Sequence, residues 1–192
     1  GGPGDYLRYD LAAQEIAERV HIGNFSLDGI TYFHYFPIII GYVYAAVTPA
    51  MVVGQLFLVW TAALAILVLY FITLELGASR RGAFFVALLG SAYPSFVFFT
   101  SYVLKDGLVI FFALLSLLLL LKLLKRFSWT LYLLLFLAAI PLVNLRSEVY
   151  DVFAITFFVF WFGFAKMELK RRVLLGIALV LLYGLPPVIA MK

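Results

Sequence analysis

An acid and an aromatic side chain near the start of the chain are the first residues whose chemistry stands out. Asp5 precedes Tyr9 by one helical turn, in a segment (5–22) that repeats apolar residues at helical spacing. A carboxylate at a membrane surface can act as a general base, so Asp5 is a candidate catalytic residue and Tyr9 a candidate substrate contact. The structural alternative is that Asp5 caps a helix or interacts with its dipole.

A second polar cluster runs from Tyr93 to Gly107 and contains the pair Lys105–Asp106. A lysine–aspartate pair at the start of a membrane span could hold a phosphate group or a divalent metal ion, Mg²⁺ or Mn²⁺. The alternative is that Asp106 caps the following helix while the Lys105 ammonium reaches toward lipid phosphates. Both interpretations stay open on the residues alone.

A third cluster, 144–151, joins two apolar stretches and contains Arg146 and Glu148. Exposed loop charges are the structural alternative, but Arg146 adjoins an apolar span, and ionisable groups at membrane depth tend to be functional. Arg146 is therefore a second candidate for binding a phosphate. His34 lies among aromatic residues and could contact substrate or ligate a metal, although a histidine in that setting is more often a structural hydrogen-bonding group.

The composition places these clusters in a membrane protein. Of 192 residues, 66% are hydrophobic and 12% charged, against about 45–50% and 25% in soluble domains. Long apolar runs exclude soluble enzymes, nucleic-acid-binding proteins, secreted disulfide scaffolds and proteins that only touch a membrane surface. The chain contains no cysteine, which excludes disulfides, thiolate chemistry and cysteine-ligated zinc.

The apolar runs predict an all-α fold, a polytopic transmembrane bundle of about six spans with one or two interfacial amphipathic helices on its outer face. Tyr32–Val47 is either a short span or a helix within an outer loop. Residues 1–50 are expected to form that loop and 51–192 the bundle. The polar start of the chain suggests an excerpt that lacks a preceding span. The expected spans lie near 51–74, 83–100, 107–124, 128–143, 152–165 and 173–190.

Basic residues orient this bundle. They fall in alternate loops and therefore on one side, which the positive-inside rule makes cytoplasmic. Most acids lie on the opposite, extracytoplasmic side, together with Lys105, Arg146 and His34. The chain is thus expected to be an integral protein of a plasma, inner or endoplasmic-reticulum-type membrane. The basic residues on the cytoplasmic side are Arg80, Arg81, Lys122, Lys125, Arg126, Lys166, Lys170, Arg171 and Arg172.

The order of these features resembles the GT-C superfamily of membrane glycosyltransferases. An acid followed by tyrosine and spaced alanines precedes an aromatic-proline segment (35–37), a basic cytoplasmic turn (76–81), Tyr93-Pro94 and Lys105-Asp106. The nearest group is the dolichyl-phosphate-mannose protein mannosyltransferase-like enzymes and their bacterial relatives that use polyprenyl-phosphate sugars. In that family a carboxylate of the first outer loop is the catalytic base, and Asp5 matches it. In related oligosaccharyltransferases a second outer loop supplies an acid for metal, and Asp106 lies in the matching loop.

The resemblance implies transfer of a sugar from a polyprenyl-phosphate donor to an acceptor hydroxyl at the extracytoplasmic face. Asp5 would take the acceptor proton, and Lys105 or Arg146 would stabilise the leaving lipid phosphate. The partners would be the lipid-linked sugar, the bilayer and an acceptor glycan, lipid or protein, without nucleic acid. The alternative function is a lipid-linked-glycan transporter or flippase, or a non-catalytic membrane subunit.

Overall fold

The computed structural model describes residues 4–30, 34–164, 173, 176 and 177. All regular structure in these residues is helical, as the sequence predicts. The helices are α1 (Asp5–His21), α2 (Tyr35–Ala46), α3 (Met51–Glu75), α4 (Arg80–Ser91), α5 (Pro94–Ser101), α6 (Asp106–Lys125), α7 (Trp129–Leu145) and α8 (Ser147–Phe164).

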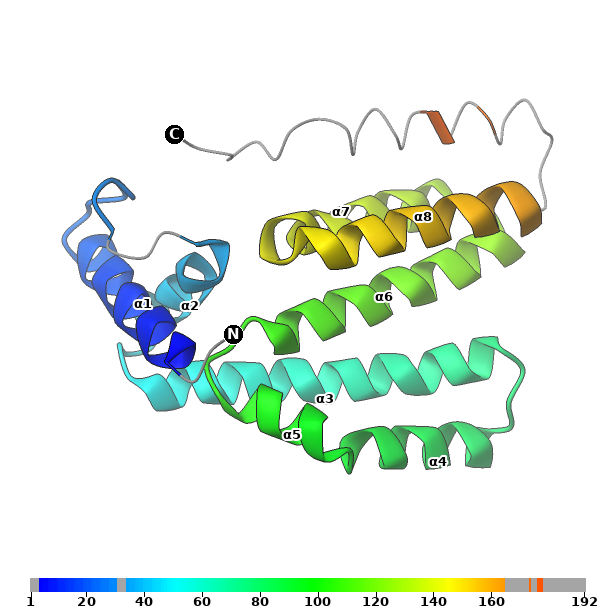
Figure 1. Cartoon of the computed structure of the whole chain (residues 1–192), viewed down its shortest axis with the longest axis horizontal. Coiled ribbons are helices and arrows are strands. Elements are labelled where there is room, and N and C mark those ends of the chain that lie inside the picture. Colours follow the sequence, from blue (N-terminus) through cyan, green and yellow to red (C-terminus); the bar gives the residue numbers. More distant parts are fainter. Residues whose placement is uncertain (1–3, 31–33, 165–172, 174–175, 178–192) are drawn as a thin grey trace.

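The long helices α3 and α6 pack side by side at the centre of the bundle (Figure 1). Helices α4 and α5 pack against α3, and α7 and α8 pack against α6. The two helices α1 and α2 lie together across one end, where α3, α6 and α8 begin and α5 and α7 end. We call this the α1–α2 end of the bundle.

The expected spans match most of these helices in position, because long apolar runs continue as helix until glycine, proline or a polar cap stops them. At the end of α3, Gly77 adopts a left-handed conformation with φ +94°, which favours glycine. Its amide donates to the Leu74 carbonyl at 2.9 Å. The Ser79 hydroxyl then accepts from the Gly82 amide at 3.2 Å and caps α4.

The expected span at 83–100 is broken in the structure. Helices α4 and α5 are bent by 58° relative to each other. Pro94 occupies the first turn of α5 and cannot donate the amide hydrogen bond that would continue α4. The sequence interpretation counted this proline inside a continuous span, and the structure corrects that.

The expected number of about six spans is not confirmed. Among the described residues, two helices, α3 and α6, are long and apolar enough to cross a membrane, or three spans if α4 and α5 form one. Helix α7 has 17 residues and is about 26 Å long, slightly short of a hydrocarbon core of about 30 Å. The expected span at 173–190 lies almost wholly outside the described residues.

Helix α2 decides between the two interpretations of Tyr32–Val47. Its 12 residues extend about 18 Å, too short to cross the bilayer. It packs instead along α1. The two helices approach closely at Gly41, where a Cβ atom would lie 2.7 Å from the Ile16 side chain. Ala13 and Ala17 are fully buried in this contact, as their helical spacing predicts.

The opposite end of the bundle carries basic residues and is called the basic end. Arg80 and Arg81 begin α4, and Lys122 and Lys125 lie in the last turn of α6. Lys125 donates to a Glu75 carboxylate oxygen at 2.8 Å and to the Glu75 carbonyl, which ties α6 to α3. The predicted basic residues beyond 164 lie outside the described residues.

Candidate functional site

The site residues expected from the sequence gather at the α1–α2 end. Asp5 and Tyr9 lie in the first turns of α1, and His34 precedes α2. Lys105 immediately precedes α6, and Arg146 lies in the junction between α7 and α8. Segments far apart in the sequence thus meet at one end of the bundle (Figure 1). We call this set of residues, with Asp106, the polar cluster.

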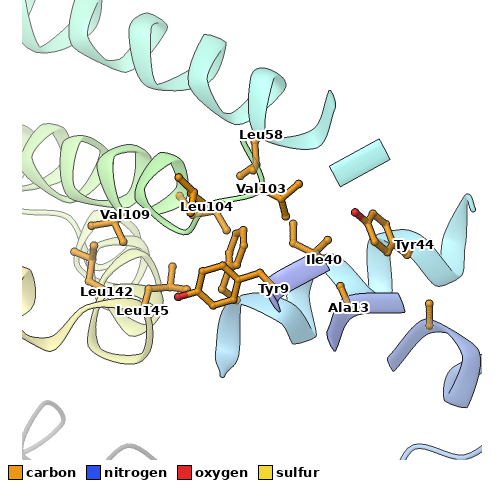
Figure 2. Close-up of a cluster of buried hydrophobic side chains, with 13 residues drawn as sticks. Tyr9, Ala13, Ile40, Tyr44, Leu58, Val103, Leu104, Val109, Leu142 and Leu145 are labelled. Carbon is orange, nitrogen blue, oxygen red and sulfur yellow. The ribbon is translucent and has the colours of Figure 1, made fainter. Parts of the chain in front are cut away.

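A buried apolar core supports the polar cluster (Figure 2). Tyr9 belongs to this core, and its ring packs edge-on against Phe36 at 5.0 Å between centroids. Val103 and Leu104 extend the core from the segment before Lys105, and Leu145 extends it from the residue before Arg146. Because these residues are buried and adjoin Lys105 or Arg146 in the sequence, they hold the backbone of both cations in place. The core joins α1, α2, α3, α6 and α7.

His34 makes three contacts, two of them within the polar cluster. Its Nδ1 accepts a hydrogen bond from the Phe36 amide at 3.2 Å and caps α2. Its ring lies 5.8 Å from the Tyr9 ring, and its Nε2 lies 3.4 Å from Nζ of Lys105. Partial burial and the positive charge of Lys105 lower the pKa of His34 below its ordinary value of 6.5. His34 therefore has the structural role that the sequence suggested, and it also contacts Lys105, a candidate phosphate-binding residue.

Asp106, the first residue of α6, and Arg146, which follows the last residue of α7, form an ion pair that joins the two helices. Arg146 donates from Nη1 to Oδ1 of Asp106 at 2.8 Å. The arginine side chain is 44% exposed and the aspartate side chain 18%. Because one guanidinium carries five N–H donors, Arg146 keeps donors for another anion. Asp106 thus orients Arg146, a pairing that the sequence analysis did not predict.

The sequence analysis named Asp106 as a candidate metal ligand, and the residues around it show whether other ligands are close. In the part of the chain that the structure describes, no group of three His, Asp or Glu side chains is close enough to hold a metal ion. The Asp106 carboxylate is also engaged by Arg146. These donors do not make a metal-ligand set at Asp106, and metal binding there stays a prediction.

The first turn of α1 is anchored by its aromatic residues. The Tyr6 ring lies 5.4 Å from the Tyr102 ring, and Tyr9 contacts His34. Asp5 is adjacent to Tyr6 and one helical turn before Tyr9, so both contacts hold the backbone that carries it. Asp5 lies in the first turn of α1, where its charge also suits the helix dipole. The N-cap of α1 is Gly4 and not Asp5, and the interaction of Asp5 with the helix dipole is compatible with a catalytic role.

A groove of about 690 Å³ opens on the surface of the bundle. It lies between α3 and the bend of α4 and α5 and reaches Tyr102, three residues before Lys105. Its lining is mainly apolar, with an amide and hydroxyls among it. The lining residues are Gln55, Ala92, Pro94, Val97, Phe98, Ser101 and Tyr102.

Sequence reasoning missed one buried polar pair. Asp10 is 5% exposed and accepts hydrogen bonds from Tyr44 at 2.5 Å and from Gln14 at 2.8 Å. Burial and the neighbouring carboxylate raise the pKa of Tyr44, so its hydroxyl stays a donor. A signal was present: Asp10 is three residues before Ala13 and seven before Ala17, on the buried face of α1.

Comparisons with known proteins found no relative of this chain. No protein-family model, no curated protein and no solved structure matches the chain.

Proposed function

We propose that this chain is an integral-membrane glycosyltransferase, or the transmembrane part of one. It would move a sugar from a polyprenyl phosphate to an acceptor hydroxyl of a glycan, lipid or protein at the extracytoplasmic face. The observation that carries this proposal is the meeting of Tyr9, His34 and Lys105 in one contact network, beside the Arg146–Asp106 pair. A carboxylate, Asp5, lies on the same helix end as this network.

The proposal includes a membrane arrangement. The bundle would cross the bilayer about six times, through α3, the α4–α5 pair, α6, α7, α8 and the segment near 173–190. Helices α1 and α2 would lie on the extracytoplasmic face. The positive-inside rule supports this orientation, because Arg80, Arg81, Lys122 and Lys125 gather at the end opposite to α1 and α2.

In the proposed reaction, Asp5 accepts the proton of the acceptor hydroxyl as its oxygen attacks the anomeric carbon. A bond forms between that oxygen and the anomeric carbon, while the bond from the carbon to the phosphate oxygen breaks. The electron pair of the broken bond stays on the phosphate, which leaves as a polyprenyl phosphate. The reaction requires no nucleotide, because the donor already carries a phosphate leaving group.

Cations of the polar cluster would stabilise the charge that develops on the leaving phosphate. Lys105 is partly buried, and Arg146 is oriented by Asp106 with other N–H groups still exposed. Partial removal from water strengthens the attraction of Lys105 for an anion. No step is assigned to a metal ion, and Oδ1 of Asp106 accepts from Arg146.

The groove beside Tyr102 supports a lipid-linked donor. It is lined by residues of the α4–α5 bend and by Tyr102, whose ring lies 5.4 Å from the Tyr6 ring at the α1–α2 end. A polyprenyl tail needs an apolar path of this kind, whereas its phosphate needs cations at the end of the path. The groove and the polar cluster together meet both needs.

The test is release of polyprenyl phosphate from polyprenyl-phosphate sugars by the purified chain in lipid nanodiscs, with acceptor-containing membrane extract. Asp5→Asn should lower the rate by about 10²–10⁴-fold, the usual contribution of a general base. Glu18→Gln is the matched control, since Glu18 is an exposed acid on the same helix. Equal rates for Asp5→Asn and the unchanged chain would refute the role of Asp5.

A transporter of lipid-linked glycans is the second candidate, and the bend between α4 and α5 is the observation that favours it. Transporters often use broken helices near the membrane midplane, and these two helices meet at 58°. In sealed vesicles a transporter would move the lipid-linked sugar between leaflets without cleaving it. Cleavage dependent on Asp5 would favour the glycosyltransferase, and movement without cleavage the transporter.

A further inference from the structure

The contact between His34 and Lys105 is unusual because it joins two hydrogen-bond donors. The Nδ1 atom of His34 accepts the Phe36 amide hydrogen bond at 3.2 Å, so Nδ1 carries no proton. In a neutral imidazole the proton is then on Nε2. That same Nε2 lies 3.4 Å from Nζ of Lys105, whose ammonium can only donate. The ring therefore lies between two donors, the Phe36 amide and the Lys105 ammonium, whereas a neutral imidazole has one acceptor nitrogen.

Lys105 belongs to no ion pair among the described residues. The ion pairs of the described residues join Arg146 to Asp106, Arg19 to Glu15 and Lys125 to Glu75, and none of these includes Lys105. The Tyr9 ring contacts the imidazole from α1, and both His34 and Lys105 are partly buried. A cation that is partly removed from water and lacks a carboxylate partner attracts anions more strongly than an exposed one.

We propose that His34 and Lys105 form a two-donor site for one phosphate group. His34 donates from Nε2 as a neutral imidazole, and Lys105 donates from Nζ and supplies the charge. Two oxygens of one phosphate can accept from two donors at this separation, which removes the mismatch between them. The inference rests on the proposed function and deepens it, because it gives the donor's phosphate two hydrogen-bond donors, His34 and Lys105, in addition to Arg146.

The proposed site assigns a specific role to His34. It is a positioning and anion-binding residue, and neither a metal ligand nor a general base. Its cap on α2 holds the tautomer, since Nδ1 is occupied by the Phe36 amide. Its lowered pKa keeps the ring neutral near pH 7, which preserves the Nδ1 lone pair for the cap.

The experiment is nitrogen NMR of the histidine-labelled chain in a phosphate-free maltoside detergent. The chain has two histidines, and His21, whose Nε2 lies 2.9 Å from the Ala45 carbonyl, is an internal control. Without ligand, His34 should show an unprotonated Nδ1 and a protonated Nε2. Farnesyl phosphate should shift the His34 Nε2 signal to saturation and leave His21 unchanged, whereas farnesol should shift neither.

The variants separate the site from non-specific binding. Lys105→Gln should weaken farnesyl phosphate binding about tenfold or more, because a charge-assisted hydrogen bond is lost. Lys122→Gln, at the basic end, should bind as the unchanged chain does. Inorganic phosphate is added in a separate titration. A His34 shift at a concentration similar to that of farnesyl phosphate would support the phosphate site and identify soluble phosphate as its ligand.

Three results would overturn the site. They are a proton on Nδ1 of His34, no His34 shift with either phosphate, or equal binding by Lys105→Gln. A failure of the two-donor site can be distinguished from a failure of the proposed function. Glycosyl transfer without a His34 shift would reject only the site, whereas a His34 shift without transfer to any acceptor would reject only the glycosyltransferase.

Discussion

Tyr44 donates a hydrogen bond of 2.5 Å to Asp10, 34 residues earlier, in the buried contact between α1 and α2. The hydroxyl of Tyr44 also approaches α3, since a Cβ atom on Gly54 would lie 2.8 Å from it. One side chain therefore connects the two end helices to the bundle. The polar cluster depends on this connection, because α1 carries Asp5 and Tyr9 and α2 is capped by His34.

Tyr44→Phe should lower the free energy of unfolding by about 1–3 kcal/mol, because the Asp10 carboxylate would stay buried with one fewer donor. Tyr42→Phe is the matched control, as Tyr42 is on the same helix and 47% exposed. The measurement is the midpoint of thermal unfolding in detergent. Equal midpoints for the two variants would show that the hydrogen bond contributes nothing to stability.

Gly41→Ala should also destabilise the fold, by about 1–3 kcal/mol, because the added Cβ would lie 2.7 Å from Ile16 and push α1 away from α2. The control is Gly82→Ala in α4, where the nearest atom lies at 3.5 Å. There the better helix propensity of alanine should be neutral or stabilising. Stabilisation by Gly41→Ala would contradict the close approach of the two helices. Thermal unfolding measures both variants.

The stability of the α1–α2 end should fall in mild acid. Because the folded chain lowers the pKa of His34 below 6.5, the unfolded chain binds the proton more readily. The contribution of neutral His34 is full above pH 6.5 and is lost as the pH falls through the lowered pKa. His34→Asn, which can still cap α2, should weaken this pH dependence. Unfolding midpoints between pH 5 and 8 test this, and an unchanged slope in the variant would contradict it. Among the described residues, Lys105 and Tyr9 contact this ring.

Asp106→Asn should reduce glycosyl transfer while changing stability by less than about 1 kcal/mol, since a partly exposed ion pair contributes little to folding. The loss would come from Arg146, which would no longer be held by a carboxylate at 2.8 Å. Glu75→Gln breaks the Lys125 ion pair at the basic end and is the control for activity. Steady-state rates and thermal midpoints separate the two effects. Full activity of Asp106→Asn would exclude an orienting role.

The absence of cysteine allows a direct test of membrane orientation. Single cysteines at Gly4, Ser101 and Ser79 occupy exposed positions. In intact cells, an impermeant thiol reagent should label positions 4 and 101 but not 79, because the first two lie at the α1–α2 end. Labelling of 79 after permeabilisation is the control for reactivity. Labelling of position 4 and 101 from opposite sides would separate Asp5 from Lys105 and refute a shared site.

Helix positions could be predicted from the sequence because their causes are local. Long apolar runs favour helices, and Gly77 and Ser79 end one helix and begin the next through hydrogen bonds to nearby residues. The buried face of α1 followed from its spaced alanines. The break at Pro94 was missed, although its cause is also local, because the apolar run continues through it.

The candidate residues could also be named from the sequence, since charged groups beside apolar spans are few. Which of them meet was decided only by the tertiary structure. His34 lies 71 residues from Lys105, Asp106 40 from Arg146 and Asp10 34 from Tyr44. Apolar burial is non-directional, so the spacing of residues defines a face but not the neighbour that covers it. The close approach at Gly41 and the packing of the bundle select those neighbours, and with them the donors that converge at the α1–α2 end.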